Sequence, residues 1–252
     1  MRIFAASLLA GVALAGATLA AAPAVKPYLA KALADPARGD MQAVDAKRHT
    51  AELMAFSGVK PGDKVADLIP GSGLFTRVFA KVVGPKGHVY MVWPNEYAQE
   101  AARDVAASDA LAADKAYGNI SVLKEPANAF SAPEKLDLVF TAQNYHDYPD
   151  KFMGKVDPVV FDKQVFAALK PGGVFLVIDH AAEAGSGMRD TDTLHRIDPA
   201  TVRQQVTSVG FVFDGESKAL ANPADDHKKL VFDKAIRGQT DQFVYRFRKP
   251  KK

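Results

Sequence analysis

The apolar run at residues 64–69 of this 252-residue chain contains an acidic residue, and two glycines follow the run. Asp67 stands near the end of that run, and Gly71 and Gly73 come shortly after it. Glycine permits a tight turn, and the helix expected after the turn offers unpaired N–H groups to a ligand. The fixed charge of Asp67 would repel a phosphate but not a cationic group. We therefore expect a nucleoside-like ligand with a cationic portion at this turn.

A second group of reactive side chains, residues 143–148 (QNYHDY), follows the apolar run at 136–142. We predict that His146 acts as a base, that Asp147 orients it, and that Tyr145 packs against a cationic centre or the substrate. The alternative is a capped loop in which the histidine and the aspartate bond only to local backbone. Because the whole group follows a single strand end, we favour the functional interpretation.

The residue types needed for a metal centre are also present. Asp179 and His180 end another apolar run, His195 lies further along the chain, and His146 and Asp147 complete the set. Asp179 can equally serve as a strand-end residue that accepts a backbone N–H. No pair in the set has the i, i+4 spacing of a helical metal motif, so we predict no metal site.

Alternating strand and helix patterns must position these residues. We predict strands at 64–69, 88–93, 119–123, 136–142, 174–178, 211–217 and 242–248, and helices at 41–56, 74–83, 95–115, 158–169 and 199–209. Helices between short buried strands imply parallel pairing, whereas adjacent late strands indicate an antiparallel edge. The expected fold is α/β, with a doubly wound, mostly parallel seven-stranded sheet that has an antiparallel edge strand. Such sheets bind ligands beyond the carboxyl ends of their strands.

Two polar segments, 181–194 and 219–241, are expected to lie near that edge of the sheet. The first should be a mobile loop over the site, and the second should shape substrate access. Between them, Asp198 is predicted to cap a helix that begins at Pro199. Arg196 can bind a carboxylate or phosphate of a substrate, although a surface ion pair is the more ordinary role.

The N-terminal residues have the layout of a secretory signal peptide. Arg2 precedes an apolar stretch without acidic residues, and small residues continue to Ala24. We predict a signal peptide over 1–24, a linker or N-terminal extension over 25–44 and one main domain over 45–252. The expected location is the periplasm or the extracellular space, and the alternative is membrane anchoring by an uncleaved signal.

Composition excludes several classes of protein. The chain has no cysteine, so it has no disulfide, no thiolate metal site and no cysteine nucleophile. Its formal net charge of +3 creates no strong field to attract nucleic acid. The expected partner is a small molecule or a protein side chain, with no nucleic acid and no stable membrane contact after signal cleavage.

The order of elements resembles that of class I S-adenosylmethionine-dependent methyltransferases over roughly residues 45–249. The resemblance rests on residues 67–73 (DLIPGSG) after the first strand and 169–173 (LKPGG) before the fifth. Residues 58–65 (GVKPGDKV) and 84–90 (GPKGHVY) resemble protein-isoaspartate-type enzymes. Residues 66–71, 143–147 and 195–199 resemble a group of exported bacterial predicted methyltransferases.

The resemblance implies S-adenosyl-L-methionine as the cofactor and methyl transfer to an unidentified small molecule or protein side chain. The implied cofactor contacts come from the glycine turn and from the ends of the second, third and fourth strands. They are Asp67, Gly71, Ser72, Gly73, Trp93, Glu96, Asn128 and Asn144.

Three positions depart from the family pattern. Ile69 stands in place of the first glycine of the turn, and Pro70 follows it. Trp93 stands where the family places a carboxylate for the ribose, with Glu96 three residues later. Asn128 stands near the position of an aspartate that contacts the adenine amine, a contact that an amide oxygen can also make.

These departures leave a second hypothesis open, a non-catalytic ligand-binding protein with a degenerate methyltransferase fold. Export favours it too, because S-adenosylmethionine is made in the cytosol. A nicotinamide oxidoreductase ranks lower, since Thr76 stands where a third glycine is expected and no acid ends the second strand.

Overall fold

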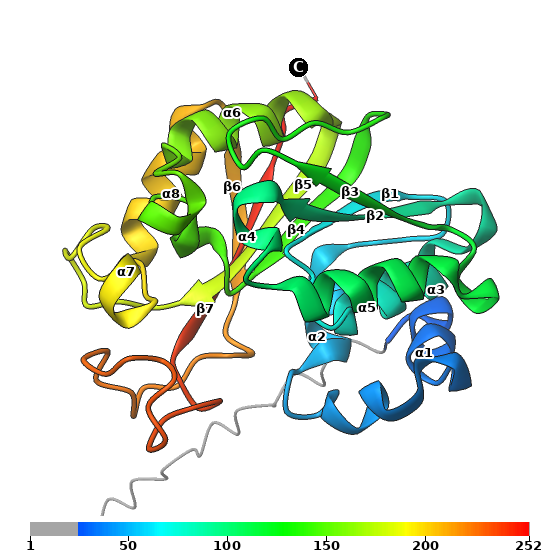
Figure 1. Cartoon of the computed structure of the whole chain (residues 1–252), viewed down its shortest axis with the longest axis horizontal. Helices are drawn as coiled ribbons and strands as arrows, with labels where there is room; N and C mark the ends of the chain where they lie inside the picture. Colours follow the sequence, from blue (N-terminus) through cyan, green and yellow to red (C-terminus); the bar gives the residue numbers. More distant parts are fainter. Residues whose placement is uncertain (1–24, 252) are drawn as a thin grey trace, which may run out of the picture.

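The computed structural model describes residues 25–251, and the predicted signal peptide lies outside the described residues. Within them, seven strands form one sheet in the order β3-β2-β1-β4-β5-β7-β6 (Figure 1). The strands are β1 (Lys64–Leu68), β2 (His88–Pro94), β3 (Ile120–Glu125), β4 (Leu136–Ala142), β5 (Leu169–His180), β6 (Val212–Ser217) and β7 (Gln242–Arg248). The predicted α/β class and the mostly parallel seven-stranded sheet are therefore confirmed.

Strand order reverses between β1 and β4, which pair in parallel with Asp67 opposite Phe140. In an open α/β sheet, a crevice forms at such a reversal, beyond the carboxyl ends of the strands. β7 is antiparallel to both of its neighbours, β5 and β6. The antiparallel strand thus lies next to the edge, and β6 forms the edge itself.

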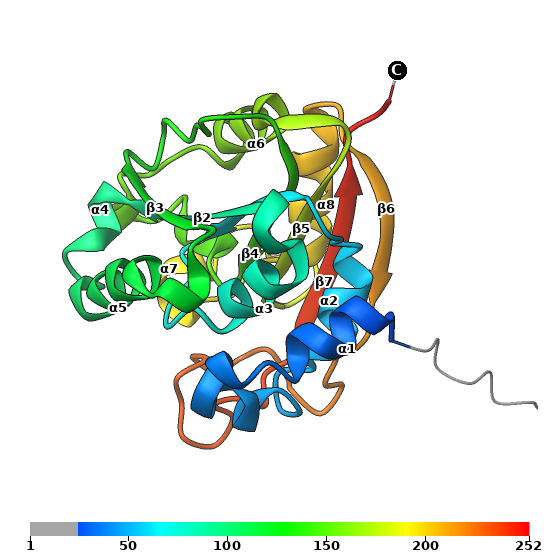
Figure 2. The same cartoon turned by 90° about the vertical axis from the view of Figure 1, so that its right-hand side faces the viewer.

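Helices cover both faces of the sheet. The α-helices are α1 (Pro27–Leu33), α2 (Thr50–Ser57), α3 (Leu74–Val83), α4 (Asn95–Ala98), α5 (Ala102–Ala113), α6 (Pro158–Ala168), α7 (Thr191–Leu194) and α8 (Pro199–Ser208). Short 3-10 segments are η1 (Pro36–Val44), η2 (Gly84–Lys86), η3 (Lys115–Tyr117), η4 (Tyr145–Asp147) and η5 (Lys151–Met153). One hydrophobic cluster joins α1, α2 and α3 to the sheet, and a second joins α6 and α8 to the opposite face. Figure 2 shows α3 and α6 on opposite sides of the strands.

The helical predictions differ from the structure near the N-terminus. The predicted helix at 41–56 is replaced by η1 and α2, because His49 adopts a left-handed φ of 48° between them. Residues 25–44, expected to be a linker or extension, contain α1 and η1. Leu29 and Ala32 of α1 are buried, and α1 packs against α3. The predicted helix at 95–115 is divided into α4 and α5. No helix among residues 25–251 has both the length and the apolar character required to cross a membrane.

Candidate active site

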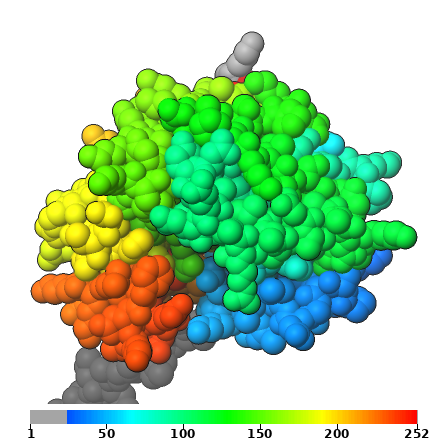
Figure 3. All heavy atoms as spheres, viewed as in Figure 1, coloured from blue at the N-terminus to red at the C-terminus, as the bar shows by residue number. Residues whose placement is uncertain are grey.

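A cleft of about 1470 Å³ opens at the carboxyl ends of β1, β4 and β5. The segment at 219–241, between β6 and β7, forms one of its walls, as the sequence predicted. The N-terminal segment that includes Lys47, Arg48 and His49 forms another. Figure 3 shows these two segments meeting on the surface, and Gly238 lies against the ammonium end of Lys47. Two segments that lie far apart in the sequence therefore meet beside the cleft.

The turn after β1 has a glycine-like backbone at a position that holds no glycine. Ile69 has a φ of 50°, in the left-handed region that a β-branched residue rarely adopts. Its N–H donates to the carbonyl of Val92 (2.8 Å), and its side chain is buried in the core. Ile69 thus combines a left-handed conformation, which carries local strain, with apolar packing in the core.

The two glycines of the turn have different roles. Gly71 has a φ of 53°, and a Cβ placed on it would meet no atom within 4 Å. The backbone at Gly71 is therefore open to a ligand in the cleft. Gly73 has a φ of 77°, and its Cβ would lie 2.9 Å from Arg77 Nη1 and 3.1 Å from Leu111 Cδ2. Gly73 leaves room for the side chains of Arg77 in α3 and Leu111 in α5, and it does not line the cleft.

Asp67 lines the cleft at the end of β1 with only 2% of its surface exposed. Its Oδ2 accepts a hydrogen bond from the hydroxyl of Thr76 at 2.5 Å. Burial raises the pKa of Asp67 to about 7, and the bond from Thr76 opposes that rise. A cation bound nearby would favour the ionised carboxylate, so this residue is suited to the cationic group of a ligand.

Trp93, the last residue but one of β2, forms a buried wall of the cleft. Its Nε1 donates to Ser108 Oγ (3.0 Å), and that hydroxyl donates to the carbonyl of Asp104 (2.9 Å). The indole is thereby fixed to α5. Asp104 and Glu100 both line the cleft beside it. The sequence analysis did not identify these two acids as candidate site residues, although their i, i+4 spacing within a predicted helix places them on one face of that helix.

Two more predicted cofactor residues, in addition to Gly73, lie outside the cleft. α4 begins immediately after Pro94 and directs Glu96 toward the loop after β3, where its Oε2 accepts from the N–H of Ala127 (2.9 Å). Asn128 is exposed, and its carbonyl accepts from the side chain of Gln164. Ser72 and Asn144 line the cleft as expected.

Asn144 connects the ends of two strands across the crevice. Its Nδ2 donates to the carbonyl of Ala142 (2.6 Å) and to that of Ile69 (3.3 Å). This amide therefore holds the loop after β4 against the turn after β1, where the order of the sheet reverses.

His146 lies at the centre of a buried polar cluster. Its Nδ1 and backbone N–H contact the two carboxylate oxygens of Asp179, at 2.7 and 2.8 Å. On the other side of the ring, Nε2 lies 3.1 Å from Asp147 Oδ1 and 3.2 Å from His195 Nδ1. Burial lowers the pKa of His146, but the charges of Asp179 and Asp147 outweigh it and raise the pKa to about 10. The cationic, doubly protonated form of the imidazole is therefore favoured at neutral pH. Asp179, to which the sequence analysis did not assign this role, orients the ring.

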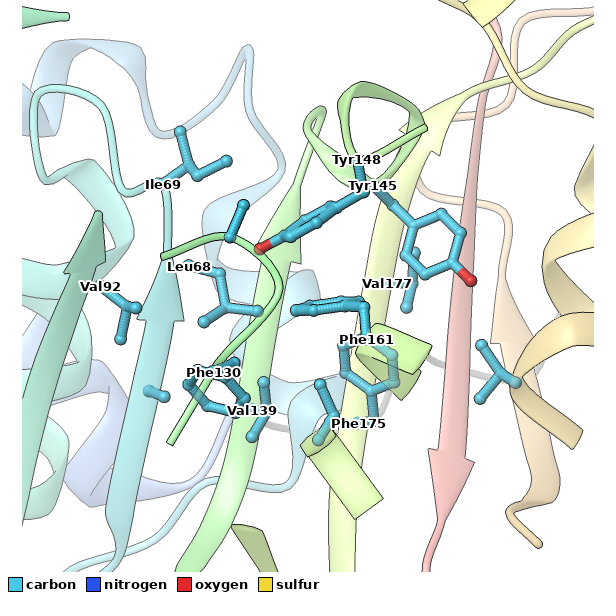
Figure 4. Close-up of a cluster of buried hydrophobic side chains, with 14 of the residues drawn as sticks. Leu68, Ile69, Val92, Phe130, Val139, Tyr145, Tyr148, Phe161, Phe175 and Val177 are labelled. Atoms are coloured by element: carbon cyan, nitrogen blue, oxygen red, sulfur yellow. The ribbon is translucent and has the colours of Figure 1, made fainter. Parts of the chain in front are cut away.

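The prediction that Tyr145 packs against the ligand is wrong. Its side chain is fully buried, and its hydroxyl donates to Asp162 Oδ2 (2.9 Å) in α6. Figure 4 shows it within the apolar cluster that includes Phe161 and Phe175. η4 is a 3-10 turn with about three residues per turn, so adjacent side chains point in different directions. Tyr145 enters the core while His146 faces the cleft.

Arg196 is buried rather than exposed, so the predicted surface ion pair is wrong. Its Nη1 lies 2.9 Å from Asp225 Oδ2 and also donates to the carbonyl of Ala181 (2.9 Å), and its Nε donates to the carbonyl of Lys229 (2.9 Å). Arg196 therefore ties the 219–241 segment to the loop after β5. The predicted cap is confirmed, since Asp198 accepts from Ala200 N at the start of α8.

Strained backbone concentrates around the cleft. Six non-glycine residues among 25–251 have positive φ, and four of them line it: His49, Ile69, Gln143 and His195. Such conformations persist where the surrounding structure imposes them, and they gather at functional sites.

Comparison with known proteins gives relatives in sequence. The chain is 32% identical over 134 residues to a ubiquinone/menaquinone biosynthesis C-methyltransferase, UbiE, of Hydrogenovibrio crunogenus, covering 53% of this chain and 47% of the relative. The corresponding protein of Vibrio cholerae is 27% identical over 201 residues, covering 78% and 64%. This chain thus spans about half to two thirds of the length of the curated relatives it matches. No protein-family model matches it.

Solved structures share its fold. A SAM-dependent methyltransferase from Aquifex aeolicus superposes with a TM-score of 0.53 at 18% identity, covering 85% of this chain and 98% of that one. One from Mesorhizobium loti gives 0.55 at 17% identity, covering 78% and 95%. The [4+2]-cyclase SpnF gives 0.57 at 15% identity, covering 81% and 80%. The chain has the class I methyltransferase fold, and the cyclase shows that this fold serves more than one kind of chemistry.

Proposed function

We propose that this protein binds S-adenosyl-L-methionine in the cleft and transfers its methyl group to an acceptor. The observation that carries the proposal is the turn after β1. A buried carboxylate, Asp67, and an open backbone at Gly71 face one cleft at the point where strand order reverses. The methyltransferase relatives in sequence support the same assignment.

The residues present fit this cofactor at most of the expected contacts. Asp67 offers a negative charge to its cationic portion, and Gly71 leaves the turn accessible. Trp93 offers an aromatic wall where the family has the ribose carboxylate. We propose that Asp104, held beside Trp93 through Ser108, takes over the contact with the ribose hydroxyls.

The cofactor would supply a methyl group on a positively charged sulfur. The protein would then have to position the two reactants and, where the acceptor carries a proton, allow that proton to leave. The cluster around His146 lies across the cleft from the glycine turn on the other side of the β1–β4 junction, and we assign it to the acceptor side. Because the carboxylates hold a proton on His146, its ring is suited to hydrogen bonding and positioning rather than to taking a proton from the acceptor. This differs from the base role that the sequence suggested.

Calorimetric titration of the purified chain with S-adenosylmethionine and S-adenosylhomocysteine tests the proposal. We expect saturable binding of both, and at least tenfold weaker binding of S-adenosylmethionine by Asp67→Asn. Glu96→Gln is the matched control, because that acid lies outside the cleft and should bind like the wild type. Equal affinity of the Asp67→Asn variant and the wild type would contradict the assigned site.

A non-catalytic ligand-binding protein is the second candidate, favoured by the substitutions at Ile69 and Trp93. The two candidates differ in turnover. Methyl transfer predicts that S-adenosylhomocysteine accumulates when the protein is incubated with S-adenosylmethionine and an extract of small molecules and proteins from its own compartment. Cofactor binding without any such accumulation would favour the second candidate.

We also propose that the protein is exported to the periplasm or beyond, on the basis of the N-terminal sequence pattern. Cell fractionation followed by intact-mass measurement tests this. An exported form shortened by about 20 to 24 residues is the expected result. A full-length chain in the membrane fraction would indicate the uncleaved anchor instead.

A further inference from the structure

Three side chains near the acceptor side of the cleft bring their donor atoms together. His146 Nε2 lies 3.1 Å from Asp147 Oδ1 and 3.2 Å from His195 Nδ1. The third side of the triangle, from His195 Nδ1 to Asp147 Oδ1, measures 3.7 Å. Two imidazole nitrogens and one carboxylate oxygen thus form a nearly equilateral set, and these residues are grouped closely enough to hold a metal ion.

The spacing matches the distances between ligands of a bound ion. Zinc binds imidazole nitrogen and carboxylate oxygen at about 2.0–2.2 Å in tetrahedral geometry, which separates neighbouring ligand atoms by about 3.3–3.6 Å. The three sides of the triangle, 3.1, 3.2 and 3.7 Å, lie around that range. An ion could bind all three atoms with only small side-chain shifts.

The surroundings of the triangle support a cation. Asp179 contacts Nδ1 of His146 at 2.7 Å and holds the ring, as carboxylates do behind metal-bound histidines, so that Nε2 faces Asp147 and His195. A bound ion would take the place of the proton on Nε2. Among the described residues, no lysine or arginine pairs with Asp147 or Asp179. Two buried carboxylates therefore share one pair of imidazoles, and a divalent ion would balance their charge.

Two separate elements supply the three ligands. His146 and Asp147 belong to η4, whereas His195 follows α7 with a left-handed φ of 51°. That strained conformation at the end of α7 places an imidazole from a distant part of the sequence beside η4. All three residues line the cleft, and the side chain of His195 is 28% exposed, so the site can be reached from solvent.

We propose that His146 Nε2, Asp147 Oδ1 and His195 Nδ1 bind one divalent transition-metal ion, with Asp179 orienting His146. Nitrogen-rich donor sets of this kind favour zinc or a similar ion over magnesium or calcium. Three protein ligands leave at least one position open toward the cleft. If the proposed methyl transfer is correct, that position would receive an oxygen or nitrogen of the acceptor.

Metal binding is tested on the purified chain after chelator treatment, in the absence of any cofactor. We expect one equivalent of Zn²⁺ by calorimetry and one of Co²⁺ by visible absorption, with Zn²⁺ displacing Co²⁺, and no comparable binding of Mg²⁺. His195→Ala should weaken Zn²⁺ binding more than about 100-fold, and Asp179→Asn about 10- to 100-fold.

His227→Ala is the matched control. His227 also has a left-handed backbone (φ 61°) and a side chain that is 27% exposed, but it pairs with Asp241 away from the triangle. Its Zn²⁺ affinity should equal that of the wild type. Thermal unfolding of each variant shows whether it remains folded. If His195→Ala is unfolded, Asp147→Asn serves as the second ligand variant.

Failure to bind Zn²⁺ or Co²⁺, or equal affinity in the wild type and both ligand variants, would overturn the proposal. Binding of S-adenosylmethionine is measured separately on the chelator-treated protein. A protein that binds the cofactor but no metal would refute only the metal site, and the reverse result would refute only the cofactor site.

Discussion

Asp179 holds His146 through both of its carboxylate oxygens, one on the ring Nδ1 at 2.7 Å and the other on the backbone N–H at 2.8 Å. The oxygen that contacts Nδ1 also accepts from the N–H of His180 at 2.7 Å. A single residue at the end of β5 therefore fixes the orientation of the ring at the end of β4. The arrangement of side chains on the His146 side of the cleft depends on this contact between neighbouring strands.

Asp179→Asn should destabilise the metal-free protein by about 3 kcal/mol, because breaking a buried charged pair leaves its partner uncompensated. Asp137→Asn is the comparison, since Asp137 is partly exposed at the opposite end of β4 and its partners can bond to water. Asp137→Asn should lower the free energy of unfolding by about 1 kcal/mol. Urea unfolding in the presence of a chelator measures both, and equal effects would argue against a special role for Asp179.

Affinity for S-adenosylmethionine should rise with pH between 6 and 8. Burial raises the pKa of Asp67 to about 7, so its carboxylate is mostly neutral at pH 6 and mostly ionised at pH 8. A cationic ligand prefers the ionised form, which predicts roughly tenfold tighter binding across this range. The pKa values of His146 and His180, about 10 and about 4, lie outside it. Calorimetry at several pH values should show this dependence in the wild type, and a persisting slope in Asp67→Asn would assign it to another group.

Asp104→Asn should weaken binding of S-adenosylmethionine about tenfold or more, because a hydrogen bond from the ribose to a charged group would be lost at about 1.5–3 kcal/mol. Asp109→Asn on the same helix is the control. That acid pairs with Lys124 on the surface and should leave affinity unchanged. If both variants bind like the wild type, the ribose contact must be sought elsewhere, with Glu100 as the remaining acid beside Trp93.

Gly71→Ala and Gly73→Ala should distinguish an effect on cofactor affinity from an effect on protein stability. Both residues have positive φ, so each substitution costs about 1–2 kcal/mol in backbone strain. Gly73→Ala adds contacts of 2.9 and 3.1 Å with Arg77 and Leu111, and should lose more stability. Gly71→Ala places a methyl group in the cleft and should mainly reduce cofactor affinity. Thermal unfolding and calorimetry measure the two effects, and a larger loss of stability in Gly71→Ala would reverse the assignment.

The order of strands and helices could be predicted from the sequence because hydrophobic periodicity and turn residues act over short distances. β4, β7 and α3 begin and end where their patterns do. The same local information identified Asp67 and the glycine turn, since a strand end followed by glycines has few structural solutions. The predicted cap at Asp198 is correct for the same reason.

Side-chain direction and long-range contacts depended on the tertiary structure. Tyr145 and His146 are adjacent in sequence, yet packing of α6 draws the first into the core and leaves the second in the cleft. Glu96 turns away because a helix begins at the residue before it. The meeting of His146 with His195 joins residues 49 positions apart. No local pattern encodes such a contact, because it forms only when η4 and the end of α7 are placed beside the same sheet edge.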